Sequence, residues 1–256
     1  MTHLAAMTWE EVQTLDRSRC VAILPVGAVE AHGPHLPLNT DVLIAEAMAA
    51  AAGRRLGARG HPPVILPSLA YTTAGYAAGF AGTVSVGADT VTRLIVEIAR
   101  SLALQGFPVL AVANAHVDPA HLAALERAGA EIAKEALLRF VCPNLAARPW
   151  APRLTDEFRT GACHAGQFET SIVLAVEPAM VKSEISASLP PNAASISRAI
   201  QEGKRTFEEA GGPRAYFGDP ARATREEGEQ SIETLGAILE EAVLGTLSPS
   251  DVRIPR

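Results

Sequence analysis

The stretch CVAILPVGAVEAHGPHLPLNTD, residues 20–41, joins a short apolar run to a polar loop and then to the start of an Ala-rich segment. The apolar run, residues 20–27, ends in a glycine and is typical of a strand that is buried on both faces. Thr40 or Asp41 is a suitable N-cap for a helix over 40–57. The stretch therefore predicts a strand, a loop interrupted by Gly and Pro, and a helix, in that order.

The same order of apolar run and helical segment recurs along the chain. Three more apolar runs are predicted to be buried strands, at 62–69, 108–115 and 137–142. Segments with helical or amphipathic patterns are predicted to be helices, at 88–105, 118–135, 167–176 and 220–244. Strands that alternate with helices build βαβ units and a parallel sheet. Segments 143–162 and 185–196 lack periodicity and are predicted to be loops that wall or cover a site, or contact another subunit.

The composition limits the classes of function. No linker interrupts the 256 residues, so we expect a single domain over 1–256. The formal net charge of -6 is spread without a basic block, which argues against a nucleic-acid partner. No apolar run approaches the length of a membrane span, and the start lacks the pattern of a signal peptide. We therefore expect a cytoplasmic protein that neither binds nor crosses a membrane.

The three cysteines, Cys20, Cys142 and Cys163, are widely spaced and odd in number. This pattern fits neither a disulfide framework nor a zinc knuckle, and it favours a reducing compartment. Cys163 adjoins a polar motif, but no feature of the sequence indicates that its pKa is lowered. We therefore do not expect Cys163 to be a nucleophile.

The loop after the first apolar run carries Glu30, His32 and His35, and Asp41 follows it. Ligands of parallel sheets collect outside the carboxyl ends of the strands, where this loop is expected to lie. Carboxylate oxygens and imidazole nitrogens suit zinc, manganese or iron, and the lack of thiolates argues against a closed structural zinc site. The alternative is a capping Asp among solvated polar side chains.

A second polar cluster, NAHVDPAH, follows the run at 108–115. His116 and Asp118 are two positions apart, so in an extended segment they project to the same side and could complete a metal site. Asp118 also precedes Pro119, a pair that is typical of a helix start with Asp as N-cap. Both interpretations of Asp118 stay open. His121 is expected to be exposed, or on the following helix, and outside the cluster.

A third cluster, CHAGQFETS at 163–171, contains His164 and Glu169. Beside a water molecule activated by metal, a His and a Glu can protonate a leaving nitrogen and handle the proton of the water. Alternatively, Glu169 complements the dipole of the helix that it begins. The chain has no Gly-x-Ser-x-Gly elbow, Walker loop or Gly-x-Gly-x-x-Gly motif, so serine-hydrolase and nucleotide chemistry are disfavoured.

These clusters make the chain similar to the creatininase (creatinine amidohydrolase) family over nearly its whole length. The matching segments are PVGAVEAHGPH at 25–35, Asp41 of NTD, FAGTVSV at 80–86, NAH with His116, HAGQFETS at 164–171 and ATREEGE at 223–229. The resemblance implies a three-layer α/β/α sandwich with a mainly parallel central sheet, and assembly as a homohexamer.

The resemblance also implies two divalent metal ions, zinc or manganese, with iron also compatible. It assigns Glu30 and His116 to one ion and His32 and Asp118 to the second. Asp41 would bridge the two ions, and His164 would be the acid/base residue. The chemistry of the third cluster adds Glu169 as a second catalytic candidate.

The predicted function is the opening of a small cyclic amide, such as a lactam, an imide or a creatinine-like ring, by a metal-activated water. Creatinine itself is disfavoured, because the pocket tryptophan pair of creatininase is not reproduced and Trp150 is the only nearby candidate. One alternative is a deformylase or peptidase of the same family that acts on an acyclic amide. Another is a catalytically silent metal-binding assembly protein.

Overall fold

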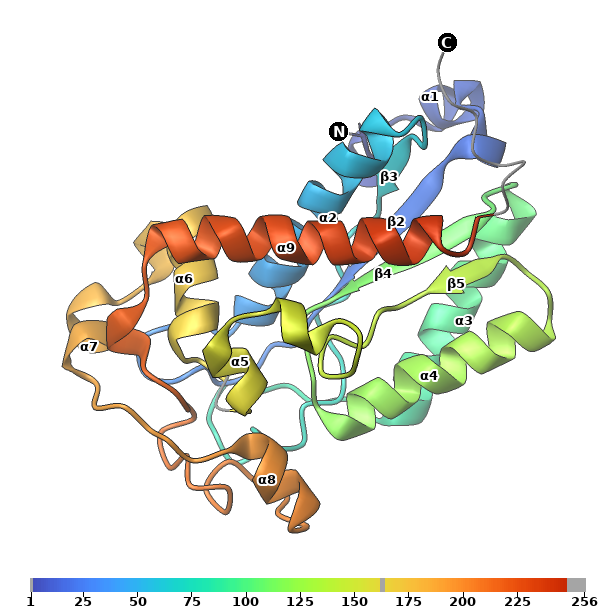
Figure 1. Ribbon diagram of the computed structural model, residues 1–256. Helices are drawn as coiled ribbons and strands as arrows, with labels where there is room; N and C mark the ends of the chain where they lie inside the picture. The colour runs from blue at the N-terminus through green and yellow to red at the C-terminus, as the bar shows by residue number, and fades with distance from the viewer. Residues whose placement is uncertain (1, 162–163, 248–256) are drawn as a thin grey trace.

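The computed structural model describes residues 2–161 and 164–247 and has a five-stranded parallel sheet at its centre (Figure 1). The strands stand in the order β1-β3-β2-β4-β5, and all four neighbouring pairs are parallel. Their bounds are Thr2–His3 for β1, Val21–Val26 for β2, Pro63–Ile65 for β3, Val109–Asn114 for β4 and Arg139–Val141 for β5. The four predicted strands are confirmed, although β3 and β5 are shorter than predicted. The edge strand β1 was not predicted.

The predicted helices are confirmed with small changes at their ends. The long helices are α2 (Thr40–Ala58), α3 (Ala88–Leu104), α4 (Pro119–Lys134), α6 (Gln167–Val176) and α9 (Arg225–Leu244). The prediction that a helix begins at 220 was wrong. Thr224 caps α9 with its side chain, which accepts a hydrogen bond from the amide of Glu227, so the helix begins only at Arg225.

Short helical elements complete the described chain. The short α-helices are α1 (Trp9–Thr14), α5 (Asp156–Thr160), α7 (Ser183–Ser188) and α8 (Ile196–Gln201). The 3₁₀ turns are Leu4–Ala6, Arg17–Arg19, Ala151–Arg153, Pro178–Met180 and Pro220–Arg222. The segments 143–162 and 185–196, predicted to be loops, therefore include α5, the end of α7 and the first residue of α8. These helices are too short to give a periodic pattern in the sequence.

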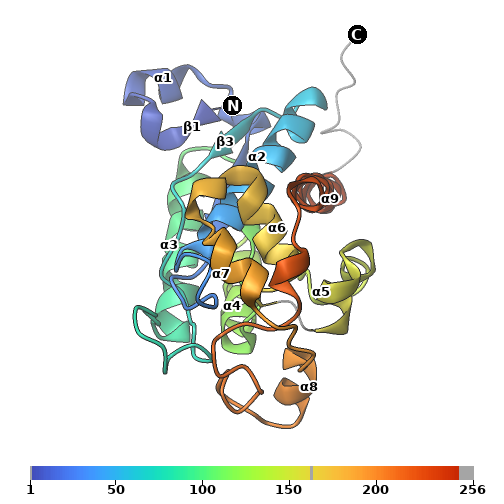
Figure 2. The ribbon, with the colours of Figure 1, turned by 90° about the vertical axis from the view of Figure 1, so that its left-hand side faces the viewer.

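Two apolar cores, one on each face of the sheet, define three layers. Side chains of β2 alternate between them: Val21 and Ile23 pack with α2, α6 and α9, whereas Ala22 and Leu24 pack with α3 and α4. Figure 2 shows α3 and α9 on opposite sides of the molecule. The chain is thus an α/β sandwich, as predicted. Within the described residues, no helix combines the length and the apolar character needed to cross a bilayer.

The close packing of α9 on α6 yields a prediction about stability. A Cβ atom at Gly228 of α9 would overlap the backbone oxygen of Ser171 on α6. Gly228→Ala should therefore lower the free energy of unfolding by about 1–3 kcal/mol, the usual cost of overpacking. At Gly57 in α2 a Cβ would meet only Pro63, at 3.6 Å. Gly57→Ala should be neutral or stabilising by up to about 1 kcal/mol. Urea unfolding of both variants checks this, and equal midpoints would contradict it.

Candidate metal centre

Six of the seven predicted site residues come together at the carboxyl ends of β2 and β4. The loop after β2 supplies two of them and the first turn of α2 one. The segment after β4 supplies one, the segment before α6 one and the first turn of α6 one. They are Glu30, His32, Asp41, His116, His164 and Glu169, and each is at most 8% exposed. Because parallel strands end at the same edge of a sheet, segments distant in sequence meet here.

One group of possible ligands consists of Glu30, Asp41 and His116. Nδ1 of His116 lies 2.9 Å from Oδ2 of Asp41 and 3.4 Å from Oε1 of Glu30. A second group consists of His32, Asp41 and Glu169. Nε2 of His32 lies 3.2 Å from Oδ1 of Asp41 and 3.7 Å from Oε2 of Glu169. Asp41 therefore offers one carboxylate oxygen to each group.

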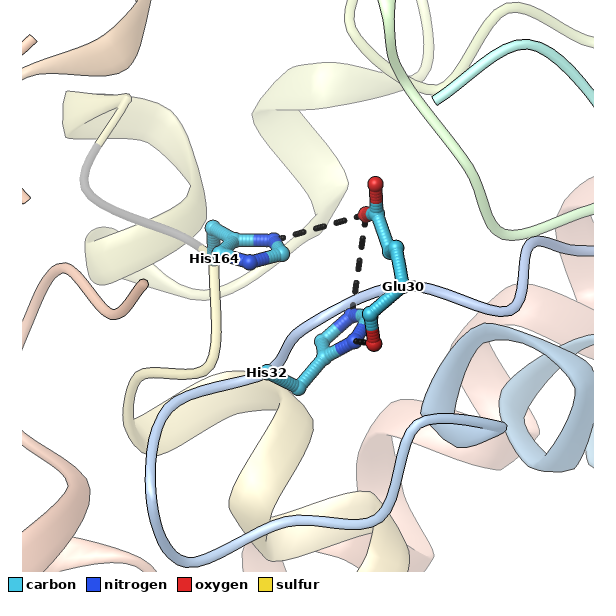
Figure 3. Close-up of side chains that lie close together, drawn as sticks. All are labelled: Glu30, His32 and His164. Atoms are coloured by element: carbon cyan, nitrogen blue, oxygen red, sulfur yellow. Dashed lines mark hydrogen bonds and ion pairs between the residues drawn. The ribbon is translucent and has the colours of Figure 1, made fainter. Parts of the chain in front are cut away.

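Each of the three histidines in the centre donates a hydrogen bond to a backbone carbonyl from its outer ring nitrogen, the one that does not face the carboxylates. Nε2 of His116 donates to the oxygen of Thr73 over 2.8 Å, and Nδ1 of His32 donates to the oxygen of Glu30 over 3.1 Å. Nε2 of His164 donates to the oxygen of Ala31 over 2.9 Å. A carbonyl can only accept, so in the neutral rings the inner nitrogen carries a lone pair. Figure 3 shows His32 and His164 both directed at the carboxylate of Glu30.

Lone pairs and carboxylates that face one another require a cation between them. Among the described residues, Oε2 of Glu30 and Oδ2 of Asp41 are buried without a hydrogen bond. Burial lowers the pKa of His32, but Asp41, Glu169 and Glu30 outweigh it and raise this pKa to about 10. The pKa of His116 is likewise raised well above its usual value, against the effect of burial, by Glu30 and Asp41. Without metal the cations are thus protons, and divalent metal ions can replace them.

The donor set fits divalent metal ions. Carboxylate oxygens and imidazole nitrogens suit zinc, manganese and iron. Metal-binding histidines commonly donate their other ring nitrogen to a carbonyl, as these do. The buried carboxylates supply the negative charge that such ions need.

Asp118 is the one predicted metal ligand outside both ligand groups. It caps α4, and its Oδ1 accepts hydrogen bonds from the amides of Ala120 at 2.8 Å and His121 at 3.2 Å. This is the capping arrangement that the sequence left open. Glu169, in contrast, joins the second group from the first turn of α6, where its Oε2 also accepts from the amide of Ala165 over 2.6 Å. Burial raises the pKa of Glu169 to about 8.

His164 lies between the ligand groups and an apolar wall. Its ring centroid is 4.4 Å from that of His32 and 4.2 Å from that of Phe207. Burial, followed by the neighbouring His32, lowers the pKa of His164 well below its usual value. The ring is therefore neutral, and its Nδ1 lone pair lies 3.8 Å from Oε1 of Glu30. Cys163, which precedes it in sequence, lies outside the described residues.

Two buried histidines support the centre without joining a ligand group. His121 lies on the following helix, α4, and outside the ligand groups, as one of the two expectations had it. The alternative that it is exposed was wrong: it is fully buried, and its Nε2 bonds to Oδ1 of Asn114 over 3.0 Å. Asn114 also donates from Nδ2 to the backbone oxygen of His116. His35 belongs to neither ligand group, and its Nε2 bonds to the hydroxyl of Thr170 over 2.9 Å. The helical spacing of His121 from the buried residues Ala124, Leu125 and Ala128 could have indicated its orientation.

A cavity of about 170 Å³ lies beside the ligand groups. Its wall is mostly apolar, and the sequence segments expected to be loops form part of it, through Leu145, Ala151, Phe158 and Ile196. The prediction that these segments wall the site is confirmed for these residues. Phe207 is a further wall residue that the sequence did not reveal.

The chain is similar in sequence and in structure to creatininases, and in sequence to precursor peptide peptidases. The family model described as "Creatinine amidohydrolase" matches residues 5–243. The mycofactocin precursor peptide peptidase of Mycolicibacterium smegmatis is 33% identical over 213 residues, which cover 82% of this chain and 78% of that protein. The creatinine amidohydrolase of Pseudomonas putida is 30% identical over 203 residues, covering 72% and 75%. A creatininase variant complexed with creatine has a TM-score of 0.75 at 25% identity, over 97% of this chain and 99% of that one.

Asp41→Ala should remove metal binding, because one carboxylate serves both ligand groups and its loss leaves two adjacent cations uncompensated. Turnover should fall to near background. Asp89→Ala is the matched control, since Asp89 also lies in a first helical turn, on α3, but with an exposed side chain. Elemental analysis of both purified variants measures the metal content. Wild-type metal content in Asp41→Ala would remove Asp41 from the site.

Proposed function

The chain belongs to the creatinine amidohydrolase family and is a metal-dependent amidohydrolase of that family. We propose that its two ligand groups would hold two divalent metal ions, which would supply the activated water for the hydrolysis of an amide. The observation that carries the proposal is the position of Asp41 between two ligand groups. We assign Glu30, Asp41 and His116 to one ion and His32, Asp41 and Glu169 to the other. Glu169 thereby replaces Asp118 as the proposed ligand of the second ion.

When bound, the ions lower the pKa of a water molecule toward about 7 and polarise the amide carbonyl. The protein positions the reacting groups around them. The hydrogen bonds from the outer ring nitrogens of His32 and His116 fix the inner nitrogens toward the carboxylates. The buried position of the centre strengthens these electrostatic interactions.

His164 is the proposed proton carrier. Its Nε2 is held by the carbonyl of Ala31, so Nδ1 is the nitrogen that exchanges a proton. The lowered pKa keeps Nδ1 unprotonated at neutral pH. It accepts the proton that the attacking water loses and delivers it to the departing nitrogen of the amide.

The substrate class follows from the cavity and from the relatives together. A small cyclic amide is the class that the family resemblance implies. The wall residues Phe158, Ile196, Ile200 and Phe207 favour a substrate with apolar groups. Relatives at 33% and 34% identity are named as precursor peptide peptidases. We therefore propose an acyclic amide in a short apolar peptide as the first candidate and a cyclic amide as the second.

We also propose that the chain assembles as a homo-oligomer, a hexamer by family resemblance. Large apolar side chains are exposed on the single chain, among them Trp9 at 72% and Leu104 at 89%. Aromatic side chains such as that of Trp9 are enriched in contacts between subunits.

A substrate screen tests the proposed function. Metal-loaded protein is incubated with short apolar peptides, formamides, lactams, imides and hydantoins, and the release of new amines and carboxylates is measured. Peptide cleavage that is lost in Asp41→Ala supports the first candidate, and ring opening alone supports the second. Retention of metal without hydrolysis in any class would favour a catalytically silent metal-binding protein.

His164→Ala should keep both metals but lower kcat by roughly 10²- to 10⁴-fold, the usual loss with a general acid/base. An unactivated amide should suffer more than an anilide with a good leaving group, since only the first needs its nitrogen protonated. Steady-state kinetics on the two substrates, with metal analysis, measure this. Loss of the metals, or equal losses for both substrates, would mean that His164 is a ligand or a structural residue.

A further inference from the structure

We propose that Arg159 binds a free carboxylate of the substrate, so that the enzyme selects peptides with an apolar residue close to a free C-terminus. This inference rests on the proposed function and names the substrate class of the same site. It depends on the charge of the cavity, on its apolar wall and on the way in which α5 is fixed to α6.

The charges around the cavity are strongly asymmetric. Four carboxylates line it, those of Glu30, Asp41, Asp118 and Glu169. Among the described residues that line it, Arg159 is the only Lys or Arg. Metal ions would occupy the side of Glu30, Asp41 and Glu169, so Arg159 is the cation that remains available to a negatively charged part of a substrate away from the reacting amide.

Arg159 lies beside the apolar wall. Phe158 precedes it on α5, and Ile196 and Ile200 of α8 line the same cavity. An apolar side chain and a carboxylate on neighbouring atoms of one ligand would meet both features at once. The C-terminal residue of a peptide with an apolar side chain has this chemistry.

The helix that carries Arg159 is fixed to the helix that carries a proposed metal ligand. Glu157 of α5 accepts hydrogen bonds from the amides of Gln167 at 2.9 Å and Phe168 at 2.8 Å, at the start of α6. The rings of Phe158 and Phe168 also pack edge to face, with centroids 5.2 Å apart. The backbone that carries Arg159 is therefore held at a set position relative to α6 and Glu169, as the selection of substrate length requires.

The guanidinium of Arg159 has donors to spare. It contacts the carboxylate of Asp156, and its Nη1 donates to the backbone oxygen of Pro152 over 3.5 Å. A guanidinium has five N–H groups, so these two contacts leave others for an incoming carboxylate. The side chain is 48% exposed, which makes it accessible to a ligand and screens its charge.

The test compares two forms of one peptide, N-acetyl-glycyl-phenylalanine and its C-terminal amide. Arg159→Gln should raise the KM of the free acid by about 10- to 100-fold, because the variant loses a charge-assisted hydrogen bond to the carboxylate. The KM of the amide should change by no more than about 2-fold. Arg159→Lys should restore part of the affinity, because it keeps the charge without the planar fork. Arg153→Gln is the matched control, since Arg153 pairs with Glu241 and does not line the cavity.

Binding of the same two peptides, measured by calorimetry in the His164→Ala background, separates this inference from the proposed function. Weaker binding of the acid alone after Arg159→Gln supports the inference even if no hydrolysis is found, in which case the proposed function fails. Hydrolysis with equal effects of Arg159→Gln on acid and amide overturns the inference and leaves the proposed function standing. An equal effect of Arg153→Gln on the acid also overturns it, and so does the absence of binding of either peptide to the parent protein.

Discussion

The sharing of one buried carboxylate between two histidines is the interaction on which the centre depends. Asp41 is placed there by a close approach of α2 to the end of β2. A Cβ at Gly27 would lie 2.6 Å from the backbone carbon of Asp41 and from the nitrogen of Val42. Only a residue without a side chain fits at this crossing, so Gly27 lets the first turn of α2 reach the ligands that follow β2 and β4.

The backbone around the centre sets the direction of each ligand. The backbone carbonyls of Glu30, Ala31 and Thr73 accept hydrogen bonds from the outer ring nitrogens of three histidines. Small shifts of these loops would therefore turn the rings away from the carboxylates. The buried pair of Asn114 and His121 holds the segment after β4 in the same way. The polar groups behind the ligands therefore matter as much as the ligands for the geometry of the site.

The four longer strands, the long helices and the residue types of the centre could be predicted from the sequence. Apolar runs and ligand-rich loops are local features, and local patterns reveal them. The choice between Asp118 and Glu169 is not local. It depends on whether an Asp before Pro119 turns its side chain to the amides of α4, and on how closely the start of α6 approaches His32. The strand β1 could not be predicted, because its two residues are too few to give a pattern. The burial of His121 was not predicted either, since it depends on contacts between segments that are distant in sequence.

The strand order has a consequence for the growing chain. β2 lies between β3 and β4, although β3 is made much earlier than β4. During synthesis β2 can pair with β3 while its other edge, next to Glu30 and His32, stays open until residues 109–114 have emerged. An open edge next to a cluster of acidic and imidazole side chains is a hazard for a nascent protein, both for aggregation and for premature capture of metal. The ligand group of Glu30, Asp41 and His116 is therefore completed only when β4 closes that edge and brings His116 to Asp41, and Glu169 joins His32 later still, with α6.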